Sequence, residues 1–336
     1  MTRKTLTTLA TGLGLLLSAA PSWALDTTRN DVRAFVDELR QQHGFDATFV
    51  ESVLANSQTQ QKILDAISRP AEKTKPWFEY RQIFITDKRI AAGVEFRREH
   101  ADRLERVSRE TGVPSEIIAA IIGVETFYGQ RTGGYRVVDA LATLGFDYPP
   151  RSKFFRRELQ EFFLLTREEQ LDTAGIKGSY AGAMGPPQFI PSSYRAYAVD
   201  GDGDGQRDLL GSWDDIIASV ANYFVEHDWK AGEPVAYLAA VDAAGGAPVT
   251  ERLKFTETVG SLARQGVSVD GELASEAPAM LLRYKVEDGD EYWLGLHNFY
   301  VITRYNRSQM YALAVYQLAT ELAAAEAAAT VAASKP

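Results

Sequence analysis

The chain has 336 residues, 45% of them hydrophobic and 24% charged, and its formal net charge is −9. This composition is that of a soluble globular protein with a sizeable core, long enough for two or three packed parts. The acidic balance excludes a nucleic-acid-binding protein, which would need clustered Lys and Arg, and the absence of cysteine excludes disulfides and argues against a zinc site.

The first 24 residues have the character of an export signal. Arg3 and Lys4 precede an apolar stretch over residues 9–20, and Ser22-Trp23-Ala24 fits the small-x-small rule before a cleavage point. The alternative is a membrane anchor, but the apolar run is too short to cross a bilayer, and no later segment is long enough. Removal of residues 1–24 would take the formal charge from −9 to −11.

Residues 25–100 are expected to form a helical domain. Val32, Phe35, Val36 and Leu39 recur at helical spacing, and further apolar positions follow after residue 46. The aromatic residues over 77–84 exceed what one helix face needs, and most are interpreted as core. Tyr80 retains the alternative of a ligand contact, because its hydroxyl needs a partner.

A second helical region, residues 101–230, contains the most informative carboxylate. The apolar run over residues 117–124 ends at Glu125, and aromatic residues and a glycine follow. A carboxyl group held against apolar side chains has its charged form disfavoured, so it can stay protonated and donate a proton to a leaving group. The alternative is an ordinary exposed Glu in the last turn of a helix.

Gly and Pro concentrate over residues 175–208 of this region. The polar side chains of Ser179, Gln188 and Ser192 stand among them, which is typical of a backbone shaped around a ligand. A sugar cleft needs such hydrogen-bonding groups beside aromatic platforms.

An acidic loop follows directly. Its sequence, Asp-Gly-Asp-Gly-Asp-Gly over residues 200–205, places acidic oxygens at positions 1, 3 and 5 and glycine at position 6, as at the start of an EF-hand calcium loop. Gly211 occupies position 12, where a bidentate Glu would stand, and Asp215 is favoured over Asp214 as the replacement. The alternative is a solvated acidic turn.

Residues 231–291 change character, because glycine, valine and alternating segments dominate them. Residues 280–286 and 291–296 are expected to form a β-hairpin across residues 287–290. Helical pattern resumes within residues 292–322, and the Ala-rich tail over 323–336 either extends the helix or frays. The fold class is therefore α+β and mostly helical, with a β insertion.

Five segments together resemble the membrane-bound lytic murein transglycosylase B family of bacterial cell-wall enzymes. They are Gly-Val-Glu-Thr at the helix end, Ser-Tyr-Ala-Gly-Ala-Met-Gly-x-x-Gln-Phe-x-Pro-Ser-Ser, the acidic loop, and residues 219–224 and 298–306, and they occur in order. The similarity covers nearly the whole chain after the signal, from residue 32 to residue 322.

The resemblance implies a lysozyme-like core with a helical domain and a small β domain around a peptidoglycan cleft. It implies that Glu125 is the catalytic acid and base. The positions that match cleft-lining or glycan-binding residues are Ser179, Gln188, Tyr223, Tyr305, Asn306 and Tyr80. The positions that match the calcium loop are Asp200, Asp202, Asp204, the Gln206 carbonyl and Asp215. Calcium is expected to be structural, and no organic cofactor is expected.

Two departures from the family pattern matter. Pro150 precedes Arg151 where the family often has two arginines, so a substrate contact there is expected to be halved. The chain also lacks the lipidation cysteine of anchored members, so a soluble periplasmic form without a membrane span is expected. Its expected partners are glycan strands of peptidoglycan and proteins of cell-wall synthesis.

Glycosidases that hydrolyse normally need two carboxylates. Near Glu125 the sequence offers Asp139 and Asp147 as a second one, but each is more simply a helix cap or turn residue. A single carboxylate agrees with what the resemblance implies: non-hydrolytic cleavage between N-acetylmuramic acid and N-acetylglucosamine, with a 1,6-anhydro end. Two alternatives are a lysozyme-type hydrolase and a catalytically silent, calcium-stabilised scaffold that binds peptidoglycan.

Overall fold

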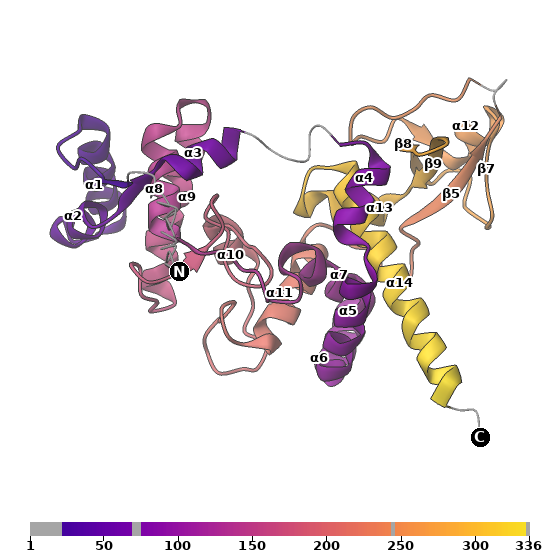
Figure 1. Cartoon of the computed structure of the whole chain (residues 1–336), viewed down its shortest axis with the longest axis horizontal. Coiled ribbons are helices and arrows are strands. Elements are labelled where there is room, and N and C mark those ends of the chain that lie inside the picture. The colour runs from indigo at the N-terminus through magenta and orange to yellow at the C-terminus, as the bar shows by residue number, and fades with distance from the viewer. Residues whose placement is uncertain (1–21, 69–74, 243–245, 334–336) are drawn as a thin grey trace, which may run out of the picture.

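The computed structural model describes residues 22–68, 75–242 and 246–333, and it is an α+β protein in which helices predominate (Figure 1). This confirms the expected fold class. Most of the expected signal peptide, residues 1–21, lies outside the described residues. Among the residues that are described, no helix has both the length and the apolar character needed to cross a membrane.

The first helices of the chain pack against helices that come a hundred residues later. In Figure 1 they lie at the left beside α8 and α9. These elements are α1 (Asn30–His43), α2 (Ala47–Ala55), α3 (Gln61–Ser68), α8 (Val137–Asp147) and α9 (Ser152–Glu168). The ring of Phe35 lies 5.9 Å from that of Phe146 and 6.2 Å from that of Phe163, which anchors α1 on this pair. A short ladder of β1 (Ser22–Ala24) and β2 (Gln58–Gln60) closes the group.

The next helices pack elsewhere. α4 (Trp77–Phe84), α5 (Asp87–Glu99) and α6 (Ala101–Thr111) lie against α7 (Ser115–Thr126) and α14 (Gln309–Ala333). The expectation of a single helical domain over residues 25–100 is therefore wrong, because the structure divides those residues between two neighbourhoods. Helical spacing shows that a face is apolar, but it does not show which later element covers that face.

Helix α7 occupies the centre of the second group. It is apolar nearly all round, which is the pattern of a helix buried on every side, and α5, α6, α11 (Trp213–Glu226) and α14 surround it. The remaining short elements between α7 and α11 are β3 (Tyr135–Arg136), η2 (Pro149–Arg151), β4 (Lys177–Gly178) and α10 (Pro191–Tyr197), of which β3, η2 and α10 contact α8 or α9. The burial of α7 fixes the position of the Glu125 backbone at its end.

The inserted sheet is antiparallel, with strand order β6-β8-β9-β5-β7. Its strands are β5 (Ala236–Val241), β6 (Glu257–Thr258), β7 (Val267–Val269), β8 (Pro278–Val286) and β9 (Gly289–Gly295), and α12 (Val259–Arg264) covers one face. Successive side chains of a strand point to opposite faces. Accordingly Leu281 joins the small core under α12, whereas Leu282 and Tyr284 join the main core.

The expected hairpin is confirmed, since β8 and β9 pair from Met280↔Gly295 to Val286↔Gly289. The predicted end of the β domain at residue 291 falls inside β9 and is too early, because the hairpin partner of β8 continues to Gly295. The chain then returns through α13 (His297–Tyr305) to α14, which runs on through part of the Ala-rich tail to Ala333.

Candidate active site

The end of helix α7 has an unusual backbone. Phe127 and Tyr128, directly after the helix, have φ of 52° and 59°, a left-handed conformation that is uncommon for residues other than glycine and is concentrated at functional sites. Thr126 ties this end to the Gly- and Pro-rich loop, because its Oγ1 donates to the Pro186 carbonyl at 2.9 Å. Glu125, in the last turn of the helix, is thereby held against that loop.

A tyrosine from the last helix bonds directly to Glu125. The Tyr311 hydroxyl, 186 residues further along the chain, donates to Glu125 Oε1 at 2.6 Å. Tyr311 is 2% exposed, and Glu125 is half-buried. Burial first, and then the Glu125 charge, raise the pKa of Tyr311 well above its usual range, so the phenol stays a neutral donor. Glu125 is therefore not an ordinary exposed residue of a last turn.

Tyr223 and Tyr305 lie together beside this pair. Their ring centroids are 4.8 Å apart, and the Phe189 ring packs against both. The Tyr305 hydroxyl donates to the Pro187 carbonyl at 2.7 Å, and the Tyr223 hydroxyl donates to the Arg304 carbonyl at 2.6 Å. Burial raises the pKa of Tyr305, and the nearby Glu125 charge raises it further. The Gly- and Pro-rich loop, residues 219–224 and residues 298–306 thus meet beside Glu125.

The hydroxyl of Ser179 is placed to donate a hydrogen bond. Its Oγ accepts hydrogen bonds from the backbone N–H groups of Ala181 (3.3 Å) and Ala183 (3.0 Å). A hydroxyl whose lone pairs are used in this way has its O–H left to give. Within the part of the chain that the structure describes, no acceptor for that O–H is found, and the side chain is half-buried.

Gln188, by contrast, is already bonded within the loop. Its Nε2 donates to the carbonyls of Thr132 (3.1 Å) and Gly185 (3.0 Å), and its own φ is 53°. Its oxygen is the group left for a ligand, since no described residue donates to it.

The other three expected site residues differ in their surroundings. Tyr80 is fully buried, with its ring 5.1 Å from that of Phe84, and it is among the groups that raise the pKa of Tyr311. Asn306 ends α13 and lines a cavity beside it. The Arg151 guanidinium lies 4.4 Å from the ring centre of Phe154, at the start of α9.

The two candidate second carboxylates are occupied elsewhere. Asp139 is 2% exposed, and its Oδ1 accepts from the Gln58 backbone N–H at 2.9 Å. Asp147 forms an ion pair with Arg29 at 2.6 Å. Both bonds join α8 to the N-terminal segment, which gives these carboxylates a structural role rather than a place opposite Glu125.

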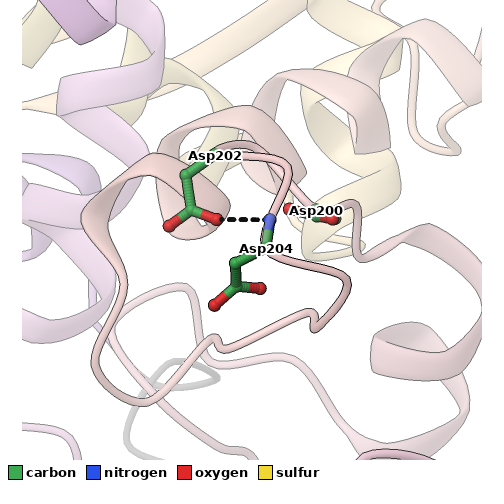
Figure 2. Close-up of side chains that lie close together, drawn as sticks. All are labelled: Asp200, Asp202 and Asp204. Atoms are coloured by element: carbon green, nitrogen blue, oxygen red, sulfur yellow. Dashed lines mark hydrogen bonds between the residues drawn. The ribbon is translucent and has the colours of Figure 1, made fainter.

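Three carboxylates of the acidic loop converge. Oxygens of Asp200, Asp202 and Asp204 lie within 4.8 Å of one another, and all three residues are exposed. Figure 2 shows them on one loop, with the bond from the Asp204 N–H to Asp202 Oδ1 at 3.2 Å. The Asp200 oxygens accept from the N–H groups of Gly203 and Gly205, so backbone donors wrap the loop around its acidic centre. A set of several carboxylates at this spacing fits a hard cation that prefers oxygen, such as Ca²⁺.

Asp215 lies outside that group of three. It is 1% exposed, and its oxygens accept from the N–H groups of Gly201 (2.7 Å) and Asp208 (2.6 Å). Asp215 therefore links the beginning of the loop at Gly201 to its end at Asp208. Burial raises its pKa despite these hydrogen bonds, and a direct bond from Asp215 to a cation stays a prediction. The Gln206 side of the loop is exposed, and its carbonyl also stays a predicted ligand.

Tyr311 is the site residue that the sequence did not identify. It lies on the buried stripe of α14 with Val315, Leu318 and Leu322, which are all 0% exposed. The sequence signal that could have identified Tyr311 was its hydroxyl on an otherwise apolar helix face, because a buried phenol requires a hydrogen-bond partner. That signal does not name the partner.

Comparisons with known proteins agree on one relationship. A family model described as Transglycosylase SLT domain matches residues 27–320. The membrane-bound lytic murein transglycosylase B of Escherichia coli (strain K12) is 43% identical over 310 residues, 88% of this chain and 83% of that protein. The structure of soluble lytic transglycosylase SltB1 from Pseudomonas aeruginosa is 52% identical, with a TM-score of 0.85 over 88% of this chain and 99% of that one. The E. coli lytic transglycosylase Slt35 in complex with calcium is 41% identical, with a TM-score of 0.83 over 90% of this chain and 96% of that one.

Proposed function

Because the chain belongs to the membrane-bound lytic murein transglycosylase B family and is a lytic transglycosylase of peptidoglycan, we propose that Glu125 performs the cleavage alone, first as acid and then as base. The lysozyme-like core implied by the sequence is confirmed by the same similarities. The observation that carries the proposal is the bond from Tyr311 to Glu125 Oε1, which orients a single half-buried carboxyl group.

In the first step the Glu125 carboxyl proton passes to the oxygen of the β-1,4 bond. The bond from that oxygen to C1 of N-acetylmuramic acid breaks, and the N-acetylglucosamine unit leaves with a free 4-hydroxyl. The acetamido oxygen of the muramic acid bonds to C1, so no protein nucleophile is needed. The O–H of Ser179, which has no acceptor among the described residues, is suited to hold this acetamido group.

In the second step the 6-hydroxyl of the same sugar attacks C1. Its proton passes to Glu125, which is now a carboxylate, and the acetamido oxygen leaves C1 as the 1,6-anhydro ring closes. The protons balance, because Glu125 ends as it began, and no water is consumed. The structural bonds of Asp139 and Asp147 support this scheme over hydrolysis, which would need a second carboxylate near the acid.

The acidic loop is proposed to bind Ca²⁺ in a structural role, through Asp200, Asp202, Asp204 and the Gln206 carbonyl, with Asp215 as the fifth predicted ligand. The convergence of the three carboxylates supports the site, and the related Slt35 has been crystallised in complex with calcium. An ion here would neutralise carboxylates that otherwise repel one another. The working place of the enzyme is proposed to be the periplasm, where its substrate lies, with proteins of cell-wall synthesis as further partners.

Mass spectrometry of the muropeptides released from isolated sacculi tests the mechanism. We expect products with 1,6-anhydro ends, each lighter by one water than the reducing-end products of a lysozyme-type hydrolase. Glu125→Gln should lower turnover by about 10²-fold to 10⁴-fold, the usual contribution of general acid–base catalysis, while the folded protein still binds sacculi. Reducing ends would support the hydrolase, and a wild-type protein that releases nothing would support the silent scaffold.

A further inference from the structure

The last strand of the inserted sheet has a partner on one side only. In the order β6-β8-β9-β5-β7, strand β7 pairs with β5 and with no other described strand. Figure 1 shows β7 at the right-hand side of the β domain, away from α7. An unpaired strand edge presents backbone donors and acceptors on which another chain can add a strand.

The backbone groups of Val267 and Val269 point to that open side. Residues that face one another across an antiparallel pair alternate between those that exchange hydrogen bonds and those that do not. The bond from the Asp242 N–H to the Gly266 carbonyl, at 2.9 Å, fixes this alternation between β5 and β7, and it leaves the two valines without bonds to β5. Among the described residues, no hydrogen bond takes up their N–H and C=O groups.

An apolar cavity of about 280 Å³ lies beside this edge. The side chains of Val267 and Val269 line it, together with those of Leu262, Leu273 and Leu294. Successive side chains of a strand point to opposite faces. A strand added to β7 would therefore place every second side chain on the face of the cavity, which favours apolar residues at alternate positions.

The surroundings of the cavity are acidic. The chain from β6 to the start of β8, residues 257–278, carries the carboxylates of Glu257, Asp270, Glu272 and Glu276 and the single cation of Arg264. Asp270, Glu272 and Glu276 are exposed, and none of them forms an ion pair with a described residue. A second copy of this chain, paired edge to edge, would bring like charges together, whereas lysine and arginine side chains would be attracted.

We propose that the β7 edge, defined as Val267–Val269 and the cavity beside them, binds an extended segment of a partner protein in which apolar and basic residues alternate. The segment adds one strand to the sheet. Its backbone bonds to the two valines, its apolar side chains cover the cavity, and its basic side chains reach Asp270 and Glu272. In this mode of recognition the main-chain bonds supply affinity and the alternate side chains supply specificity. The partner is held on the β domain, so Glu125 stays free to act.

A labelled peptide of about seven residues, in which lysine and valine alternate, tests the inference by fluorescence anisotropy. Val269→Pro removes one outward N–H at a position where proline is tolerated, because that N–H is not part of the ladder. The variant should bind the peptide roughly tenfold more weakly than the wild type, because a hydrogen bond is lost and the ring obstructs the incoming strand. The matched control, Val269→Thr, keeps the N–H and a branched side chain and should bind nearly as the wild type does. Both variants should release muropeptides at the wild-type rate.

The charge of the β7 edge is tested separately, with a variant that leaves the strand intact. Asp270→Asn/Glu272→Gln should raise the Kd for the peptide roughly threefold to tenfold, since two surface ion pairs are lost. The control is Asp102→Asn/Glu105→Gln, which makes the same change of charge on α6. Both of these residues are exposed and lack side-chain partners among the described residues, so the control should bind as the wild type does.

Equal binding by the wild type and Val269→Pro would overturn the inference. So would equal binding of a peptide of the same composition with its lysines and valines in two blocks, because charge alone would then explain the affinity. A wild type that leaves the anisotropy of the peptide unchanged up to about 1 mM would also overturn it. A wild-type dimer that Val269→Pro dissociates, detected by analytical ultracentrifugation, would assign the β7 edge to a second copy of this chain and refute the proposed occupant.

Discussion

Tyr311 restrains the side chain of Glu125. A carboxyl group free to rotate would place its proton in many directions, whereas the 2.6 Å bond from the Tyr311 hydroxyl restrains the position of Oε1. Because the pKa of Tyr311 is raised by burial and by the Glu125 charge, the phenol remains a donor at every working pH. The same bond can be accepted by the carbonyl oxygen of the protonated acid and by the carboxylate, so it serves both proposed steps.

Tyr311→Phe should therefore lower kcat with little change in KM. Loss of a hydrogen bond to a charged group is worth about 1.5–3 kcal/mol, roughly ten- to a hundredfold in rate. The measurement is steady-state release of muropeptides. Tyr316→Phe on the same helix is the matched control, because that hydroxyl donates to the Ala236 carbonyl at 3.1 Å, away from the site. If both variants retain wild-type kcat, Tyr311 does not orient the acid.

At the scale of elements, the packing of one tyrosine ring explains why two helix positions are occupied by glycine. Tyr128 inserts between α5 and α7, where a Cβ built on Gly93 would lie 2.2 Å from its Oη and a Cβ built on Gly123 would lie 2.6 Å from its Cζ. The Gly of the Gly-Val-Glu-Thr segment is thus required by close packing two residues before the proposed catalytic carboxylate.

Gly123→Ala should destabilise the protein by about 1–3 kcal/mol, the usual cost of overpacking a filled core. Urea unfolding monitored by circular dichroism measures this. Gly134→Ala is the control, since a Cβ there would meet nothing within 4 Å, and it should change the unfolding midpoint only slightly. Equal midpoints for both variants would mean that the Tyr128 ring can move aside.

The acidic loop should make the stability of the protein dependent on calcium. At a free calcium concentration a hundred times the dissociation constant, binding stabilises the folded state by about 2.7 kcal/mol, so a chelator should lower the melting temperature. In Asp200→Asn/Asp204→Asn this response should vanish, whereas exposed Asp102→Asn on α6 should keep it. A wild-type transition that is the same with and without chelator would contradict the proposed site.

At the scale of the whole molecule, the pH dependence of stability is a balance between carboxylates whose pKa is raised by folding and carboxylates whose pKa is lowered. Helix α9 carries one of each kind. Glu158 is 2% exposed, and burial raises its pKa although Ser192 donates to it twice. Glu168 is paired with Arg195, whose hydrogen bonds lower the pKa of Glu168. The ordinary value for both is 4.5.

Glu158→Gln and Glu168→Gln should shift stability with opposite signs. The Glu158 charge costs more in the folded state, so this residue destabilises the wild type increasingly as the pH rises from 4.5 through its raised pKa. The free energy of unfolding of Glu158→Gln should thus increase relative to that of the wild type over that pH range. The Glu168 charge is favoured in the folded state, so its contribution is present above 4.5 and is lost as the pH falls through its lowered pKa. Glu168→Gln should match the wild type only at low pH. Urea unfolding from pH 3 to pH 7 measures both differences, and parallel curves would contradict the assignment.

Local pattern was sufficient for the features that depend on neighbours in the chain. The apolar run that ends at Glu125, the Asp-Gly alternation over residues 200–205 and the β8–β9 hairpin each follow from spacing, because helix periodicity, loop geometry and strand alternation act over a few residues. Their order along the chain was also sufficient to indicate the family and the lysozyme-like core.

Only the tertiary structure decided which distant groups meet. It paired Tyr311 with Glu125 across 186 residues, assigned Asp139 and Asp147 to the N-terminal segment, and divided residues 25–100 between two neighbourhoods. The physical reason is that an apolar face or a polar side chain specifies the chemistry of its partner but not the partner itself. That choice is made when all the elements pack into one core.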